Sequence, residues 1–192
     1  MLVLASASPR RRELLTQAGF SFTVHPAHIP EDPLPNEDPI AYVTRLALEK
    51  AQAVYGELDG TGVQVLGADT TVIVDHHILG KPEDAADAAR MLRMLSGRAH
   101  RVATGVALVT ARSSEAKAEV TEVYFQPLTD AEIAGYVATG EPMDKAGAYA
   151  IQGRAARWIP RIEGCYFNVV GLPIALVAAL LDASHGPSGS DS

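Results

Sequence analysis

The chain begins with an apolar strand that leads directly into a helix. Leu2–Ala5 is an apolar run, and Ser8 and Pro9 follow it closely. Serine is a preferred N-cap residue, proline is favoured at the first helical position, and Gly19 supplies a typical helix end. A strand followed this closely by a helix is typical of proteins in which helices cover a sheet. We therefore expect an α/β fold.

The rest of the chain continues to alternate between strand and helix patterns without an internal repeat. Strands are predicted at Phe20–Val24, Val63–Leu66, Thr71–Val74, Val102–Thr110, Glu119–Gln126, Tyr149–Ile151 and Ala156–Ile162. Helices are predicted at Pro39–Tyr55, Asp84–Leu95, Thr129–Gly140 and from Pro173 onward. The two long mid-chain strands, joined by a polar loop, predict a hairpin, so the sheet should be mixed. Residues 1–183 are expected to form a single domain, and the Gly/Ser/Pro-rich tail 184–192 is expected to fray.

Composition places the chain among globular proteins and narrows its partners. With 192 residues, 47% of them apolar, it can bury a sizeable core. A net charge of −7 argues against binding to nucleic acid or to anionic membranes, which need a positive surface. A small anionic ligand remains compatible, because one basic pocket can override the overall charge.

No segment resembles a targeting or membrane sequence. Met1–Ala5 is too short for a signal peptide, and no apolar run approaches the roughly 20 residues that span a bilayer. The single cysteine, Cys165, excludes a disulfide within the chain and fits a reducing compartment. Its Gly-Cys-Tyr-Phe surroundings predict a half-buried, inert thiol on a strand. A cytoplasmic protein is therefore expected.

The start of the first helix is a candidate anion site. The run Ser-Ala-Ser-Pro-Arg-Arg-Arg begins at Ser6 and places hydroxyls and guanidiniums beside free N–H groups of a helix N-terminus. Hydroxyls and guanidiniums both donate to phosphate oxygens. Three successive arginines cannot all face one ligand, because they lie about 100° apart around the helix. The alternative is an ordinary capped helix with solvated arginines.

Two further charged residues stand at the edges of apolar segments. Lys50 lies at the margin of the apolar stripe of the second helix, so it either snorkels along the core edge or points into a polar cleft. Asp69 follows a buried strand, and ligands gather outside such strand ends in α/β folds. A carboxylate there can bind Mg²⁺ or polarise water. The alternative is a turn aspartate that bonds nearby backbone N–H groups.

Two Gly-punctuated segments complete the candidate set. Lys81 stands in a Gly-Lys-Pro turn, but no P-loop sequence precedes it. Gln152 stands in Ile-Gln-Gly, where its amide could bond the edge of a base. Glycine at such positions allows close backbone approach.

These segments occur in an order that resembles the Maf family of nucleotide pyrophosphatases. The matching motifs, from Leu2 to about Leu181, are S-A-S-P-R-R, the loop glutamate Glu31, L-E-K-A, G-A-D-T, G-K-P, L-S-G-R, D-K-A-G-A-Y, I-Q-G and V-V-G-L-P. The resemblance implies an elongated mixed sheet flanked by helices, with two lobes around a central cleft, as in the inosine-triphosphate pyrophosphatases. It implies hydrolysis of a nucleoside triphosphate to the monophosphate and pyrophosphate with a divalent cation, Mg²⁺ or Mn²⁺.

The resemblance also assigns roles to individual residues. Asp69 matches the catalytic carboxylate, either as a general base or mainly as a metal ligand, with Glu31 as a second metal-side carboxylate. The residues expected to contact the substrate phosphates are Ser8, Arg11, Lys50 and Lys81. Arg12 is left as a plain surface residue.

Three positions are expected to select the substrate. The family has a branch that acts on dTTP and UTP and a branch that acts on 7-methyl-GTP, and Arg10, Thr70 and Gln152 match the first. The sequence departs from the family pattern at Ala150, where glycine is frequent, and at Pro30, where a second acid is common. The alternatives are the 7-methyl-GTP branch, modified pyrimidine nucleotides as substrates, and a non-enzymatic regulator of cell division or septum formation. A homodimer is also compatible with the family.

Overall fold

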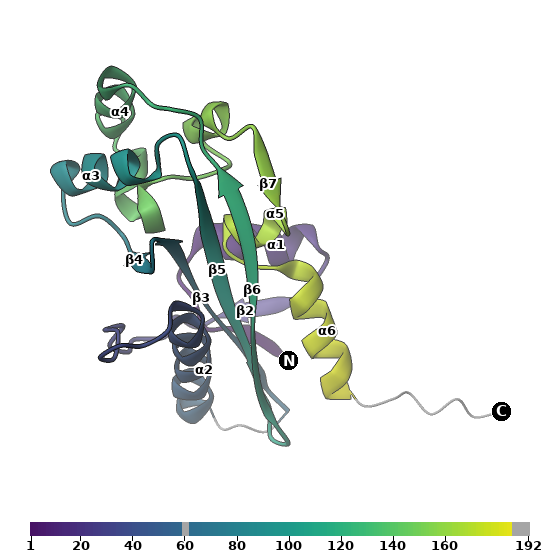
Figure 1. Cartoon of the computed structure of the whole chain (residues 1–192). Helices are drawn as coiled ribbons and strands as arrows, with labels where there is room; N and C mark the ends of the chain where they lie inside the picture. Colours follow the sequence, from purple (N-terminus) through teal and green to yellow (C-terminus); the bar gives the residue numbers. More distant parts are fainter. Residues whose placement is uncertain (59–61, 186–192) are drawn as a thin grey trace. The chain divides into compact units, whose positions relative to one another are not determined.

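The computed structural model describes residues 1–58 and 62–185, which form a mixed α/β fold (Figure 1). The strands are β1 (Leu2–Leu4), β2 (Phe22–Val24), β3 (Gln64–Val74), β4 (His77–Leu79), β5 (Ala99–Val109), β6 (Ser114–Tyr124) and β7 (Arg161–Glu163). The α-helices are α1 (Pro9–Gln17), α2 (Pro39–Glu57), α3 (Ala85–Leu95), α4 (Asp130–Val137), α5 (Tyr166–Val170) and α6 (Ile174–His185). Three short 3₁₀ helices are η1 (Glu141–Asp144), η2 (Ala146–Ala148) and η3 (Arg154–Trp158).

The strands form one mixed sheet, as the sequence predicts. The seven strands follow the order β2-β1-β3-β5-β6-β7, with β4 paired to β3. β1 is parallel to both β2 and β3, whereas β4 is antiparallel to β3 and β7 is antiparallel to β6. The sheet therefore has a parallel part around β1 and antiparallel pairs that involve β4 and β7.

The chain divides into two compact units. Unit 1 comprises Met1–Asp69, Thr104–Glu119 and the segment from Gly171 onward, and unit 2 comprises Thr70–Ala103 and Val120–Val170. The single domain over residues 1–183 stays a prediction. Of the predicted tail, residues 184 and 185 close α6, and residues 186–192 lie outside the described part of the chain.

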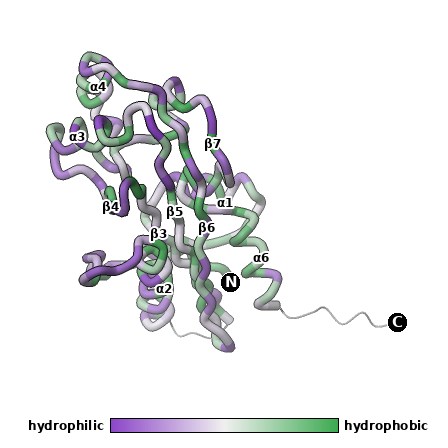
Figure 2. The backbone as a smooth tube through the Cα atoms, viewed as in Figure 1, coloured by the Kyte–Doolittle hydropathy of each residue, from purple (hydrophilic) through white to green (hydrophobic). Residues whose placement is uncertain are grey.

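Helix α2 packs directly on the sheet of unit 1 because two glycines leave room for its backbone. A Cβ atom on Gly67 of β3 would lie 2.1 Å from the carbonyl oxygen of Ala47, and one on Gly105 of β5 would lie 2.1 Å from that of Val43. Figure 2 shows the contrast between the hydrophobic strand segments and the hydrophilic loop before α2. The core of unit 1 contains Val3, Ala5, Ala47, Ala51, Val54, Val65, Ala107 and Val109.

Unit 2 has its own core, to which α3 and α4 contribute their apolar faces. Leu92 and Leu95 of α3 and Ile133 of α4 are buried in it. The predicted capping box at the start of α4 is present, with Thr129 and Glu132 bonding each other's backbone N–H groups. Local hydrogen bonding thus sets where α4 begins.

One prediction about the central strands is wrong. Val63–Leu66 and Thr71–Val74 are not two separate strands, because the single strand β3 (Gln64–Val74) contains all of their residues except Val63. Gly67 lies within this strand, where the absence of a side chain lets the backbone of α2 come close. Asp69 therefore lies inside β3 rather than at its end.

The predicted strands after residue 148 are also largely wrong. Tyr149–Ile151 is not a strand, and Ala156–Ile162 divides between η3 and the short β7. Tyr149 and Trp158 pack into the core of unit 2 from irregular and 3₁₀ segments, so their apolar character reflects burial and not pairing. Cys165 is half-buried as expected, but it precedes α5 and does not lie on a strand.

Candidate active site

The polar residues of unit 1 converge at the carboxyl end of β1. The parallel pairing of β1 with β3 ends at Leu4 and Leu66, and the N–H of Ala5 donates to the carbonyl of Leu66 at 2.8 Å. β3 continues beyond this point, so Asp69 lies past the end of its parallel neighbour. Ser6 likewise follows the end of β1. The expected position of Asp69 at the end of its own strand is therefore wrong, because it lies inside β3, past the end of the neighbouring strand β1.

Lys50 connects two carboxylates at this point. Its Nζ lies 2.7 Å from Oδ1 of Asp69 and 2.7 Å from Oε1 of Glu31. Lys50 and Asp69 are only 7% and 8% exposed. The lysine therefore does not snorkel towards solvent. A buried ammonium is stable when carboxylates pair with it, and two carboxylates around one ammonium leave a net negative charge.

Arg11 of α1 is bonded to the backbone around this cluster. Its Nη1 donates to Oγ of Ser6 at 3.1 Å and to the carbonyl of Ala68 at 2.9 Å, and its Nε donates to the carbonyl of Gly171 at 2.9 Å. The guanidinium thus ties the start of α1 to the residue immediately before Asp69 and to the segment that precedes α6.

The groups around Arg11 shift the pKa of its guanidinium in opposite directions. Burial lowers the pKa of its guanidinium; Asp69 opposes this shift, Arg10 adds to it, and Glu31 opposes it. The proximity of both carboxylates places Arg11 in the same electrostatic environment as Lys50.

The N-terminus of α1 carries the expected serine cap. The φ of Ser8 is −62° and its ψ is 118°, and its Oγ accepts from the N–H of Arg11 at 3.5 Å. The N–H of Ser8 in turn donates to Oγ of the buried Ser6 at 3.2 Å. Two hydroxyls therefore stand beside the helix N-terminus, as the sequence predicts.

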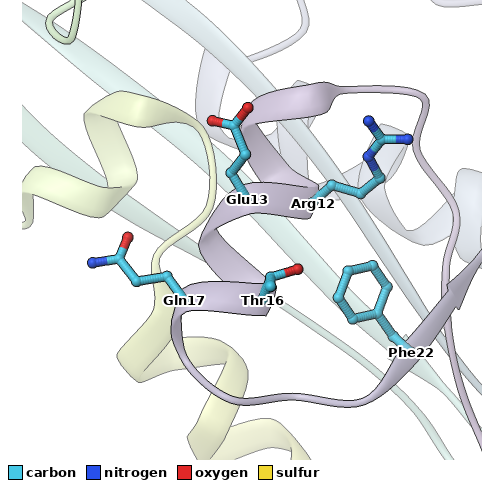
Figure 3. Close-up of a pocket in the computed structure, with 5 residues that line it drawn as sticks. All are labelled: Arg12, Glu13, Thr16, Gln17 and Phe22. Atoms are coloured by element: carbon cyan, nitrogen blue, oxygen red, sulfur yellow. The ribbon is translucent and has the colours of Figure 1, made fainter.

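Arg12 lies apart from this cluster. Together with Phe22 of β2 and other residues of α1 it lines a hollow of about 390 Å³ (Figure 3). Its side chain is exposed, which agrees with its expected role as a surface residue. The other residues around the hollow are Glu13, Thr16 and Gln17.

Of the remaining predicted residues, Arg10 is half-buried on α1 in unit 1, and the others belong to unit 2. Thr70 is half-buried on β3, whereas Lys81 and Gln152 are exposed. The N–H of Gly147 donates to the carbonyl of Gly80 at 3.0 Å, so the Gly-Lys-Pro and Lys-Ala-Gly-Ala-Tyr motifs adjoin. Gly147 has a φ of 67°, and a Cβ atom there would lie 2.7 Å from Val72, which explains the glycine.

The chain that carries these sites matches known proteins over nearly its full length. The model of the family described as Maf-like protein matches residues 1–184. The chain belongs to the Maf family. A Koribacter versatilis protein named dTTP/UTP pyrophosphatase is 54% identical to this Maf protein over 180 residues, 94% of this chain and 92% of that protein. A Moorella thermoacetica protein of the same name is 56% identical over 182 residues, 94% of this chain and 93% of that protein.

A solved structure supports the fold of this Maf protein. The Staphylococcus aureus Ham1 protein aligns with a TM-score of 0.53 at 12% identity, covering 95% of this chain and 98% of the other. At this identity the likeness shows the fold alone. The mixed α/β fold predicted from the Maf resemblance is thereby confirmed.

Two residues beside the predicted sites were missed at the sequence level. The Oη of the buried Tyr42 on α2 donates to the carbonyl of Glu31 at 2.7 Å. Its signal was available, because Tyr42, Leu46 and Lys50 recur every fourth position and so share a helix face.

Glu141 is the second missed residue, and it supports the turn that carries Gln152. One of its oxygens accepts from Oη of Tyr136 at 2.8 Å and from the N–H of Arg154 at 3.1 Å. The N–H of Ala150 donates to Oη of Tyr136 at 3.4 Å. Both ends of the turn are thus bonded to one Tyr–Glu pair. No motif or spacing signalled this arrangement.

The donor set of this Maf protein fits a hard divalent cation. Among residues 1–58 and 62–185, no group of three or more His, Cys, Asp or Glu side chains is arranged to hold a metal. Glu31 and Asp69 nevertheless meet at one lysine, and Mg²⁺ is usually held by one or two carboxylates together with water and substrate phosphates.

Within the same described ranges, no helix has the length and apolar character to cross a membrane.

Proposed function

We propose that this Maf protein hydrolyses dTTP and UTP to the nucleoside monophosphate and pyrophosphate. The observation that carries the proposal is the pairing of buried Lys50 with both Asp69 and Glu31 at the carboxyl end of β1. The relatives named dTTP/UTP pyrophosphatase support the substrates, because they are 54% and 56% identical over 94% of the chain.

Asp69 is proposed to act on the water that attacks the α-phosphorus. As general base, it accepts a proton while the water oxygen bonds to phosphorus and the bond to the pyrophosphate oxygen breaks. Lys50 supplies a fixed positive charge at 2.7 Å from the carboxylate. In the alternative role, Asp69 serves mainly as a metal ligand.

Glu31 and Asp69 are the residues proposed to hold the divalent cation, Mg²⁺ or Mn²⁺. Such a cation, when bound, neutralises phosphate charge and lowers the pKa of a coordinated water. Glu31 is suited to this role because its side chain is 55% exposed and its oxygens can exchange Lys50 for a cation.

Phosphate binding is assigned to Ser8, Arg11, Lys50 and Lys81. Ser8 stands at the start of α1, where the helix dipole favours anions and the serine hydroxyl can donate to a phosphate oxygen. Arg11 already bonds two backbone carbonyls, so it either shares its remaining contacts with phosphate or orients the segment before Asp69. The assignment of Lys81, in unit 2, rests on its Gly-Lys-Pro motif.

Substrate selection is assigned to Arg10, Thr70 and Gln152, which match the dTTP/UTP branch. The name dTTP/UTP pyrophosphatase, which both relatives carry, favours this branch over the 7-methyl-GTP branch. Modified pyrimidine nucleotides remain within the same assignment. A homodimer and a cytoplasmic location stay predictions.

A substrate panel tests the proposal. The protein is incubated with Mg²⁺ or Mn²⁺ and each of dTTP, UTP, CTP, GTP and 7-methyl-GTP, and the products are separated. We expect monophosphate and pyrophosphate from dTTP and UTP. Orthophosphate with a diphosphate would contradict attack at the α-phosphorus, and a preference for 7-methyl-GTP would contradict the branch.

An Asp69→Asn variant separates an enzyme from a purely regulatory binding protein. It should retain nucleotide binding and lose hydrolysis, while Arg12→Ala, at an exposed position of α1, should retain both. If Asp69→Asn hydrolyses dTTP at the wild-type rate, the catalytic assignment is wrong.

A further inference from the structure

The loop that carries Glu31 has little core of its own to fix it. The segment from His25 to Asp38 contains four prolines, and residues 30–36 are all exposed. The Glu31 side chain is itself 55% exposed. Figure 2 shows the part of this loop next to α2 as hydrophilic. Burial therefore cannot explain why the Glu31 carboxylate stands beside Lys50, and another interaction must supply the position.

Two side chains of α2 hold the backbone at this point. Oη of Tyr42 donates to the carbonyl of Glu31 at 2.7 Å, and Nη2 of Arg45 donates to the carbonyl of Asp32 at 3.2 Å. Two consecutive carbonyls of the loop are thus bonded to residues one turn apart on the same helix. We call these two side chains the Tyr42–Arg45 clamp.

Arg45 of the clamp is itself held by two glutamates, Glu37 and Glu49. Arg45 forms a fork to Glu37 at the far end of the loop, with Nε and Nη2 at 2.6 Å and 2.7 Å from its two oxygens, and Nη1 bonds Glu49 of α2 at 3.1 Å. The guanidinium carbon lies 5.7 Å from the centre of the Tyr42 ring. Bidentate pairing of this kind restricts the orientation of an arginine.

Tyr42 of the clamp and Glu37, which pairs with Arg45, each keep one protonation state around neutral pH. Burial, together with the charges of Asp69 and Glu31, raises the pKa of Tyr42 to about 12. The hydrogen bonds from Arg45 lower the pKa of Glu37 to about 2. The hydroxyl therefore remains a donor and the carboxylate remains charged at neutral pH.

We propose that Tyr42 and Arg45 are positioning residues that hold Glu31 at Lys50 and Asp69 and thereby set the affinity of this site for a divalent cation. The proposal rests on the assignment of Glu31 and Asp69 to the metal under the proposed function. Neither clamp residue needs to touch the nucleotide. Their effect passes through the loop backbone, because releasing two carbonyls allows Glu31 to sample positions from which it reaches neither Lys50 nor a shared cation.

A direct Mn²⁺ titration tests the clamp independently of turnover. Mn²⁺ alone is added to the wild type and to Tyr42→Phe, and unbound Mn²⁺ is measured by electron paramagnetic resonance. Tyr42→Phe keeps the ring and removes only the hydroxyl, so we expect about five- to tenfold weaker Mn²⁺ binding. Arg45→Met should weaken binding similarly, and the double variant should weaken it further.

A double-mutant cycle with Glu31 separates positioning from a general loss of structure. If the clamp acts through Glu31, Tyr42→Phe should add little once Glu31→Gln is present, because the side chain it positions has lost its charge. Thr44→Val is the matched control on α2. Thr44 bonds the carbonyl of Ile40 within the helix at 2.6 Å, so its loss should leave Mn²⁺ binding unchanged. Thermal midpoints show whether each variant is folded.

The outcomes distinguish this proposal from the proposed function. Unchanged Mn²⁺ binding by folded Tyr42→Phe and Arg45→Met variants would overturn the clamp, as would a wild type that binds no Mn²⁺. Fully additive effects of Tyr42→Phe and Glu31→Gln would also overturn it. If the wild type binds Mn²⁺ through the clamp but hydrolyses neither dTTP nor UTP, the clamp stands and the assigned substrates fail.

Discussion

Lys50 and Asp69 are 19 residues apart in the sequence, and Lys50 Nζ lies 2.7 Å from Asp69 Oδ1. The two residues come from α2 and β3, and the contact depends on how closely the helix lies on the strand. Gly67 of β3 makes this approach available, since a Cβ atom there would overlap the carbonyl of Ala47. The candidate catalytic pair is thus a consequence of a missing side chain two positions away.

Gly67→Ala is therefore expected to damage both the fold and the site. The added Cβ meets backbone at 2.1 Å, which cannot be relieved by rotating a side chain, so we expect a loss of about 1–3 kcal/mol or more in the free energy of unfolding. Urea unfolding and the rate of dTTP hydrolysis measure the two effects.

Gly56→Ala on α2, the helix that packs on Gly67, is the matched control for that substitution. No atom lies within 4 Å of a Cβ atom at Gly56, which is a helical position. We expect it to raise the free energy of unfolding by about 0.4–1 kcal/mol with no change in hydrolysis. A Gly67→Ala protein as stable as wild type would contradict the packing argument.

Removing the ammonium of Lys50 should separate stability from activity. Lys50→Met leaves Asp69 as a buried carboxylate without its lysine, for which we expect a cost of about 3 kcal/mol in the free energy of unfolding. The double variant Lys50→Met/Asp69→Asn removes both charges and should recover most of that stability, yet hydrolyse neither dTTP nor UTP. Recovery of activity in the double variant would show that the pair is structural only.

The stability of the protein is expected to fall in mild acid because of His100 in unit 2. His100 is buried, its Nε2 lies 2.7 Å from Oη of Tyr149, and burial together with Arg98 lowers its pKa to about 3. The unfolded chain binds a proton near pH 6.5 and the folded chain does not, so stability is fully present above that pH and decreases as the pH falls towards 3.

A non-titrating variant isolates this contribution. His100 and Tyr149 pack edge to face with Phe125, so His100→Phe/Tyr149→Phe keeps an aromatic cluster and removes the titrating ring. Unfolding free energies are compared between about pH 4 and pH 6. The wild type should lose up to about 1.4 kcal/mol more per pH unit than the variant. Parallel pH profiles would rule out His100 as the cause.

The turn around Gln152 offers a test of substrate selection. Glu141→Ala leaves the buried hydroxyl of Tyr136 and the N–H of Arg154 without their acceptor, which should cost about 1–3 kcal/mol of stability. The preference for UTP over CTP should fall, because Gln152 loses its fixed position. Mn²⁺ binding should not change.

Gln152→Ala provides the comparison for that variant. Gln152 is exposed, so its loss should reduce the preference for UTP over CTP while leaving the unfolding free energy within about 0.5 kcal/mol of wild type. If Glu141→Ala destabilises the protein but keeps full selectivity, the turn does not depend on the Tyr–Glu pair for its function.

The sequence alone determined the features that depend on neighbouring residues. The helix starts at Ser8–Pro9 and at Thr129 were predicted because their capping hydrogen bonds join residues no more than three positions apart. The order of the motifs identified the family resemblance and, with it, the candidate residues. The charge of −7 narrowed the range of partners without reference to any contact.

Only the tertiary structure decided how distant residues meet. It showed that β3 is one continuous strand that includes Gly67. The packing of Gly67 against α2 comes from residues distant in the sequence, so the neighbouring residues could not indicate it. The tertiary structure turned Lys50 towards two carboxylates, and it brought Tyr42 to the carbonyl of Glu31. The sequence gives the chemical type of each side chain, whereas packing sets the distances between side chains. Those distances decide whether a set of polar residues forms a candidate active site.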